Sequence, residues 1–325
     1  MRRSISALPC KAATVVDDRS VIVRDLVKDF PGVRAIDHLT FDVAPGEIFG
    51  IVGPDGAGKT TTMRILAGVL PPDAGTATVA GCDVAGDPEG VKNLISYMPQ
   101  RFGLYEDLTV DENIRFYADL FGVSAAERER HAARLLTAAG MSEFRGRLAG
   151  KLSGGMKQKL GLVCALVHTP KVILLDEPTT GVDPVSRRDF WRILYSLLAE
   201  GVAILTSTAY LDEAERCHRV ALLHQGRLLF CDTPQELKNR LHGAVLAVRS
   251  TEPRAVRDQL HGAPGISSLV MTGDGVHLVV DDAALRAPEL EARLTASATP
   301  FEKVEQVAPS IEDLFVHAVT EGHGA

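Results

Sequence analysis

Short apolar runs dominate the first part of the chain. Residues 20–28 and 35–43 alternate apolar and polar side chains, which predicts two half-exposed strands joined by a turn at Pro31-Gly32. The stretches Ile48 to Val52 and Val172 to Leu175 are instead apolar almost throughout. Short continuous apolar runs are typical of strands buried on both faces of a sheet.

The middle of the chain changes to a helical period, and the last third mixes both patterns. Helices are predicted at residues 109–121 and 124–139, with Ser124 and Glu127 as a capping box for the second. Beyond residue 241 the pattern predicts alternating strands and helices, with a hairpin around Gly273-Asp274-Gly275. We therefore expect a disordered lead-in at 1–19, a main domain at 20–241 with a helical insert at about 101–152, and an α+β domain at 242–320.

A glycine-rich stretch follows the first buried run directly. It fits the pattern of Gly, any four residues and Gly-Lys-Thr, between a predicted strand and a predicted helix. Successive N–H groups of such a turn converge on an anion, and the helix N-terminus adds its dipole. In this interpretation Lys59 reaches the β- and γ-phosphates and the Thr60 hydroxyl binds Mg²⁺. The predicted nucleotide-binding residues here are Gly53, Pro54, Asp55, Gly56, Ala57, Gly58, Lys59, Thr60 and Thr61.

Two further motifs follow this loop in a set order. Ser153-Gly154-Gly155 forms a second glycine-rich turn before an apolar helix predicted at residues 159–167. The run at residues 172–175 then ends in two carboxylates, Asp176 and Glu177. In order and spacing, the three motifs resemble those of ATP-binding cassette (ABC) ATPases over residues 20 to about 240.

This resemblance implies roles for individual residues. Asp176 would hold Mg²⁺, while Glu177 would orient or deprotonate the attacking water. Gln100 would reach the metal-bound water or the γ-phosphate, and Phe30 would stack on adenine, although residue type alone equally allows a core or hinge Phe. Asp183 matches a loop that crosses to a partner subunit. The implied catalytic residues are Glu177, Gln100 and Lys59, the implied metal ligands are Thr60, Gln100 and Asp176, and Ser153, Gly154 and Gly155 would contact ATP held by the partner.

The resemblance also implies a fold and a setting. The expected fold is an α/β P-loop ABC ATPase cassette with a RecA-like core, an antiparallel β subdomain and a helical subdomain, followed by a small α+β domain. The ending Ile311-Glu312-Asp313-Leu314-Phe315 resembles the tail of ATP-binding subunits of ABC-2-type exporters. We therefore expect an ATPase that pairs with a second cassette subunit, identical or not. It would dock on separate membrane permease subunits through the helical insert and the segment Phe102 to Leu108, at the cytoplasmic face of the membrane.

The chain departs from the family pattern after the predicted strand at 202–207. Ala209 stands where the family places a histidine that contacts the γ-phosphate. Losing one such donor typically costs about 2.7–4 kcal/mol of transition-state stabilisation. Either Glu177 suffices for slow hydrolysis, or a different ATPase carries its own histidine and the two sites are unequal; we favour the second. A regulatory ATP clamp that barely hydrolyses ATP is a further alternative, as is an importer ATPase.

Composition and charge argue against several other classes of protein. The net charge of −7 argues against a general nucleic-acid binder. No apolar run approaches the ~18 residues that span a bilayer. The first residues lack an apolar segment of signal-peptide type. Five cysteines without paired metal spacing suggest free thiols in a reducing cytoplasm. The resemblance implies that the permease, and not this chain, selects the transported substrate.

Overall fold

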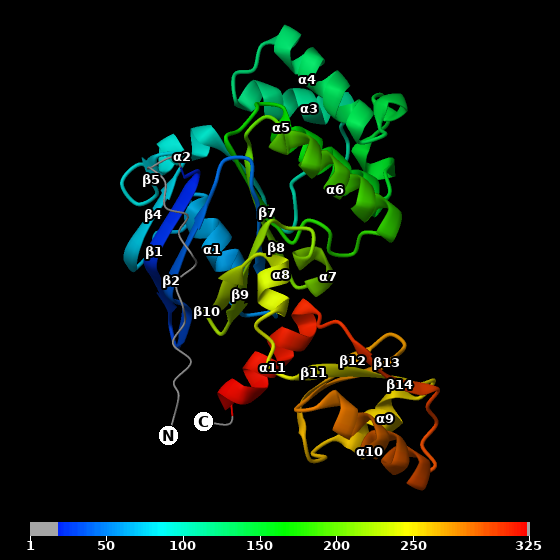
Figure 1. The fold of residues 1–325 in the computed structure, drawn as a ribbon. Helices are drawn as coiled ribbons and strands as arrows, with labels where there is room; N and C mark the ends of the chain where they lie inside the picture. The colour runs from blue at the N-terminus through cyan, green and yellow to red at the C-terminus, as the bar shows by residue number, and fades with distance from the viewer. Residues whose placement is uncertain (1–18, 324–325) are drawn as a thin grey trace. The chain divides into compact units, whose positions relative to one another are not determined.

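The computed structural model describes residues 19–323 (Figure 1). The chain forms two compact units. The larger unit runs to residue 210 and includes 217–228, while the smaller unit comprises 211–216 and the chain from 229 onward. The predicted lead-in, apart from residue 19, lies outside the described residues. The predicted domain limits at 241 and 242 remain predictions.

The larger unit is built on a six-stranded sheet ordered β10-β9-β3-β8-β7-β6, whose edge strand β10 begins in this unit and continues beyond residue 228. β3 pairs in parallel with β8 and β9, and β7 pairs in parallel with β6 and β8. Every residue of β3, β7 and β8 is buried, as expected for a parallel sheet covered on both faces. The carboxyl ends of these parallel strands therefore meet at one edge. The strands are β3 (Ile48–Val52), β6 (Ile95–Met98), β7 (Val172–Asp176), β8 (Ala203–Thr208), β9 (Arg219–His224) and β10 (Arg227–Asp232).

A second sheet in this unit is antiparallel and ordered β2-β1-β4-β5. Gly32 has a φ of 80° in the predicted turn between the first two strands, a conformation that glycine adopts without steric cost. The predicted alternating strands are thus confirmed. The strands are β1 (Val21–Phe30), β2 (Val33–Val43), β4 (Ala74–Val79) and β5 (Cys82–Asp83).

Helices complete the larger unit, and their starts follow from capping. Complete capping boxes begin α3 at Thr109 and α4 at Ser124, which confirms both predicted helices. α5 starts at Gly154 and not at the predicted Lys159, because the Ser153 side chain caps its N-terminus. The helices are α1 (Lys59–Leu66), α2 (Pro88–Leu94), α3 (Val110–Leu120), α4 (Ala125–Ala138), α5 (Gly154–Leu166) and α6 (Pro184–Leu198), with 3₁₀ turns at Ser142–Phe144 and Ala149–Lys151.

The smaller unit is an α+β structure around an antiparallel sheet ordered β12-β13-β11-β14. The predicted hairpin is confirmed as β12 and β13. β14 was not predicted, because its short, partly exposed sequence is identified only by its pairing with β11. The elements are α7 (Leu211–Ala214), α8 (Pro234–Lys238), β11 (Ala244–Arg249), α9 (Pro253–Leu260), β12 (Ile266–Thr272), β13 (Gly275–Val280), α10 (Ala283–Ala296), β14 (Lys303–Val307) and α11 (Ile311–His323).

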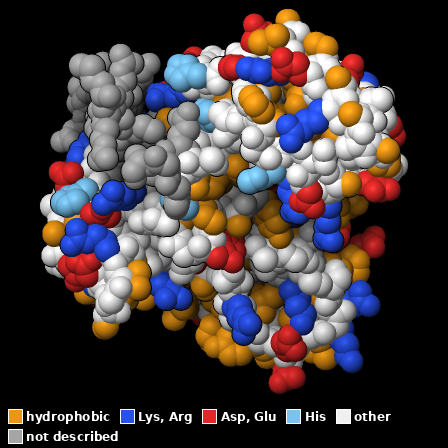
Figure 2. Space-filling view, turned by 90° about the horizontal axis from the view of Figure 1, so that it is seen from below, with side chains coloured by type: hydrophobic (Ala, Val, Ile, Leu, Met, Phe, Trp, Pro, Cys, Tyr) orange, Lys and Arg blue, Asp and Glu red, His pale blue; other side chains and the backbone are white. Residues whose placement is uncertain are grey.

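Three surface and thiol features bear on the sequence expectations. Within residues 19–323, no helix has the length and apolar character needed to cross a membrane. On the face shown in Figure 2, acidic and basic side chains are interspersed. Cys82, Cys164 and Cys217 form no disulfide bond. Cys231 is disulfide-bonded, so the expectation of free thiols is wrong there; Cys10 lies outside the described residues.

Candidate functional site

The glycine-rich loop joins the end of β3 to the start of α1. Gly58 precedes α1 with a φ of 100°, and a Cβ there would lie 2.5 Å from the Ala35 carbonyl oxygen. A Cβ on Gly53 would lie 2.2 Å from the Leu223 carbonyl oxygen. Because backbone atoms occupy both places, only glycine fits. The backbone of Ala35 and of Leu223 therefore requires glycine at these two positions of the motif.

Lys59 is the first residue of α1 and is 4% exposed. Its Nζ donates hydrogen bonds to the carbonyl oxygens of Gly53 at 2.8 Å and Pro54 at 3.1 Å. The same ammonium lies 3.1 Å from Oε1 of Glu177. The side chain therefore bends back over its own loop, toward the end of β7.

Asp176 ends β7 and is almost fully buried. Its Oδ1 accepts hydrogen bonds from Thr60 Oγ1 at 3.0 Å and from Ser207 Oγ at 2.7 Å. The Tyr97 hydroxyl lies 3.5 Å from Oδ2. Burial, together with the charge of Asp176, raises the pKa of Tyr97 to about 12, so this neighbour stays neutral.

The oxygen atoms of Thr60 and Asp176 are suitable ligands for a Mg²⁺ ion. Mg²⁺ prefers hydroxyl and carboxylate oxygens together with phosphate oxygens. Thr60 and Asp176 offer such oxygens 3.0 Å apart at the mouth of the phosphate loop. Within residues 19–323 no cluster of three His, Cys, Asp or Glu side chains could hold a metal alone. The residues present therefore fit a Mg²⁺ ion whose coordination a nucleotide completes.

Glu177 follows β7 with a φ of 49°, in the left-handed region. Its N–H donates to the Ser207 hydroxyl at 3.0 Å, and its Oε2 accepts a hydrogen bond from Gln100 Nε2 at 2.9 Å. Gln100 follows β6, Glu177 follows β7 and Ser207 lies near the end of β8. The three contacting residues therefore come from the carboxyl ends of three neighbouring strands. The structure thus places the predicted Gln100 on Glu177, and its role as a direct metal ligand stays a prediction.

Ala209 directly follows β8 and carries no polar side-chain atom. The Tyr210 N–H donates to Thr208 Oγ1 at 2.9 Å, and the Arg187 guanidinium lies 4.8 Å from the Tyr210 ring centroid. His218 is elsewhere: its Nδ1 accepts the N–H of Ile48, at the opposite end of β3 from the loop. His218 therefore cannot replace the missing side chain.

The second glycine-rich turn forms a separate group with Asp183. Ser153 Oγ accepts the Met156 N–H at 3.3 Å at the start of α5. A Cβ on Gly155 would lie 3.0 Å from Asp183 Oδ2, so the two residues are close neighbours. In the described part of the chain, no hydrogen bond or ion pair joins Ser153, Gly155 or Asp183 to the phosphate loop.

Phe30 ends β1 with 43% of its surface exposed. Lys28 Nζ lies 5.7 Å from its ring centroid, and Asp73 accepts a hydrogen bond from that ammonium. An exposed ring is available to stack on a base, whereas a core Phe would be buried. The stacking role remains a prediction.

Sequence reasoning missed Ser207 and Tyr97, which both contact Asp176. Ser207 lies opposite Asp176 in the parallel register of β7 and β8. The only signal in the sequence was the polar end of β8, Thr206 to Thr208, and it does not show which of these residues faces Asp176.

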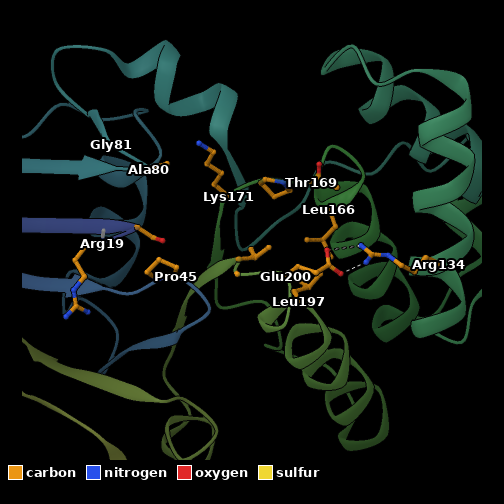
Figure 3. Close-up of a pocket in the computed structure, with 14 residues that line it drawn as sticks. Arg19, Pro45, Ala80, Gly81, Arg134, Leu166, Thr169, Lys171, Leu197 and Glu200 are labelled. Carbon is orange, nitrogen blue, oxygen red and sulfur yellow. Dashed lines mark hydrogen bonds and ion pairs between the residues drawn. The ribbon is translucent and has the colours of Figure 1, made fainter. Parts of the chain in front are cut away.

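A cavity of about 500 Å³ lies elsewhere in this unit (Figure 3). Its lining includes residues just before β7 and β8, so it lies at the opposite edge of the sheet from the phosphate loop. Arg134 pairs with Glu200, while Lys171 and Arg19 point in different directions (Figure 3). Its charged side chains therefore do not converge on one point, in contrast to those at the end of β7.

Comparisons with known proteins agree with this geometry. The family model described as ABC transporter matches residues 36–180, and that described as ATP-binding protein DrrA1-3-like, C-terminal domain, matches residues 233–319. "Probable multidrug ABC transporter ATP-binding protein YbhF" of Escherichia coli K12 is 44% identical over 305 residues, covering 93% of this chain and 52% of the relative. The chain thus spans about half the length of that relative.

Two further proteins match over most of their own length. "Daunorubicin/doxorubicin resistance ATP-binding protein DrrA" of Streptomyces peucetius is 41% identical over 248 residues, 75% of each chain. A solved structure titled "Structure of ATP binding subunit of ABC transporter" matches with a TM-score of 0.62 and 32% identity, covering 68% of this chain and 92% of that one. The predicted fold class is confirmed.

Proposed function

Because this chain belongs to the family of ABC transporter ATP-binding subunits, we propose that it binds Mg·ATP and hydrolyses it to power export through a separate membrane permease. The observation that carries the proposal is the convergence of Lys59, Thr60, Asp176 and Glu177 at one sheet edge. This arrangement combines a phosphate-binding cation, metal-binding oxygens and a carboxylate base.

In the proposed reaction each residue has a physical task. The loop N–H groups and Lys59 hold the β- and γ-phosphates, and bound Mg²⁺ neutralises charge on their oxygens. Thr60 and Asp176 would hold that ion. Glu177 would accept the proton of the attacking water, with Gln100 orienting its carboxylate through the 2.9 Å hydrogen bond.

A complete site requires a second cassette subunit in this proposal. The Ser153-Gly154-Gly155 turn and Asp183 are grouped at the starts of α5 and α6. Backbone N–H groups at the start of a helix suit a phosphate. Since this group has no bond to the loop of its own chain, it would serve the ATP bound by the partner subunit.

Ala209 leads us to propose that hydrolysis by two identical copies is slow and that the physiological partner is a different ATPase. Alanine offers no side-chain donor at this position. A hydrolysis-poor ATP clamp is the second candidate function, supported by the same residue.

The permease would dock on the helical insert, with the chain lying at the cytoplasmic face of the membrane. Tyr105 is 47% exposed and Phe116 is 40% exposed, and their ring centroids are 4.7 Å apart. Exposed aromatic pairs of this kind are enriched at protein interfaces. The names of the relatives, which refer to multidrug transport, daunorubicin/doxorubicin resistance and Nod factor export, support an exporter.

ATP turnover of the purified chain, with Glu177→Gln as the blank, tests this proposal. Mg²⁺-dependent turnover above the blank would support a competent homodimer. ATP binding without turnover would support the unequal pair or the clamp. A chain that binds no ATP in the presence of Mg²⁺ would contradict the proposal.

A further inference from the structure

Ser207 connects the two carboxylate residues at the end of β7. It is fully buried in β8, opposite Asp176. Its hydroxyl donates to Asp176 Oδ1 at 2.7 Å and accepts the Glu177 N–H at 3.0 Å. One hydroxyl group therefore contacts both residues, using its single donor for the first and a lone pair for the second.

The second contact bears on an unusual backbone. Glu177 has a φ of 49°, which side chains with a Cβ rarely adopt. Its N–H is shared between the Ser207 hydroxyl and the Ser207 carbonyl oxygen, which lies 3.2 Å away. These bonds anchor the peptide that sets the direction of the Glu177 side chain.

The first contact bears on the metal. Thr60 also donates to Oδ1 of Asp176, but Thr60 is itself a proposed metal ligand. The hydrogen bond from Ser207, in the neighbouring strand β8, is shorter, at 2.7 Å against 3.0 Å for that from Thr60. A donated hydrogen bond fixes the rotation of the carboxylate, as hydrogen bonds to metal ligands commonly do.

We propose that Ser207 is a positioning residue for the ATPase site: it orients the Asp176 carboxylate for the metal and holds the backbone of Glu177 in the left-handed conformation. This inference rests on the proposed Mg·ATP function. It assigns a role to a residue that no sequence motif marked.

Four variants of the full chain test the proposal. Ser207→Ala and Ser207→Val remove the hydroxyl, whereas Ser207→Thr keeps it in a side chain with the shape of Val. Thr206→Val is the matched control, because Thr206 is buried in the same strand and its hydroxyl has no hydrogen-bond partner within residues 19–323. Thermal unfolding checks that each variant is folded, and Ser207→Ala, which only removes atoms, carries the test if Ser207→Val does not fold.

The main readout is binding of Mn²⁺, a spectroscopic probe for Mg²⁺, in the presence of ADP, measured by electron paramagnetic resonance. We expect Ser207→Ala and Ser207→Val to weaken Mn²⁺ binding about tenfold, the low end of the range for partners of metal ligands. ADP binding in EDTA should be unchanged. Ser207→Thr and Thr206→Val should bind Mn²⁺ as the unmodified chain does.

Two results would overturn the inference. Wild-type Mn²⁺ affinity in the hydroxyl-free variants would show that Ser207 does not orient Asp176. Equal weakening by Ser207→Thr and Ser207→Val would assign the effect to shape alone. A third result, no Mn²⁺ binding by the unmodified chain in the presence of ADP, would contradict both this inference and the proposed function.

Discussion

Lys59 and Glu177 form an ion pair with 3.1 Å between Nζ and Oε1. Both side chains are buried, with 4% and 10% of their surfaces exposed. The pair joins the phosphate loop after β3 to the carboxylate after β7, across the intervening strand β8. The cation expected to bind phosphate and the expected base are therefore coupled electrostatically.

Removing one partner of this pair should destabilise the larger unit. We expect Lys59→Met to lower the free energy of unfolding by about 3–5 kcal/mol, because it leaves the buried Glu177 carboxylate without its cation. Adding Glu177→Gln should restore most of that loss. Urea unfolding of the four chains of this double-mutant cycle measures the coupling, with exposed Lys151→Met as the control. Additive effects would contradict a coupled pair.

A histidine at position 209 should restore a donor to the γ-phosphate. We expect Ala209→His to raise ATP turnover up to about 10²-fold, within the range for one transition-state donor. Ala209→Leu provides the control for side-chain bulk and should not raise turnover. Steady-state phosphate release in the assembled complex is the measurement, and an unchanged rate would argue against a catalytic deficit at this position.

The phosphate loop should not tolerate a side chain at Gly58. Its φ is 100° and a Cβ would lie 2.5 Å from the Ala35 carbonyl oxygen, so Gly58→Ala must displace backbone. We expect ATP affinity to fall by at least about tenfold, since a small displacement of the N–H groups weakens several phosphate contacts. Gly146→Ala is the control, because a Cβ there meets open space. Equal ATP affinity in the two variants would contradict the expected geometry.

The exposed aromatic pair should matter for transport and not for ATP binding. A deletion of Tyr105 and Glu106 would test this surface only coarsely. It would remove, besides the aromatic ring, the Glu106–Lys157 ion pair and the hydrogen bond from the Tyr105 N–H to Asn113. Tyr105→Ala with Phe116→Ala is therefore the sharper change. We expect co-purification with the permease and transport to fall at unchanged ATP affinity; Leu285→Ala, an exposed residue of α10, is the control. Normal transport by the double variant would refute this docking surface.

The smaller unit contains a pH-sensitive pair. His277 Nδ1 lies 3.2 Å from Oδ1 of the buried Asp313, which raises the pKa of His277 despite partial burial. Burial alone would raise the pKa of Asp313, but hydrogen bonds from His277 and Ser310 hold it below its ordinary value. At pH values between the lowered pKa of Asp313 and the raised pKa of His277, the carboxylate is negative and the imidazole is positive.

The sign of the pH dependence follows. The His277 contribution is complete below its unfolded pKa of about 6.5 and is lost as pH rises through the higher folded pKa. The Asp313 contribution is complete above its unfolded pKa of about 3.9 and is lost as pH falls through the lower folded value. We expect the unfolding temperature of the smaller unit to fall above neutral pH, and His277→Gln to flatten that fall; an equal fall in both chains would contradict it.

The sequence determined the elements whose cause is local. The alternating runs predicted β1 and β2, and the continuous apolar runs predicted β3 and β7. The Ser124 capping box predicted the start of α4. The loop around Gly58 was predictable because its conformation depends on the absence of a side chain at that residue. The order and spacing of the three motifs were sufficient to identify the ABC ATPase family.

Tertiary structure decided what depends on register and on partners distant in the chain. The contact of Ser207 with Asp176 exists because β7 and β8 lie in parallel with those two residues opposite each other. The strand β14 is stabilised by pairing with β11, since its own residues bury little. The placement of His218 at the far end of β3 likewise follows from strand order. A linear pattern of side chains sets local conformation, but hydrogen bonds between strands choose which distant residues meet.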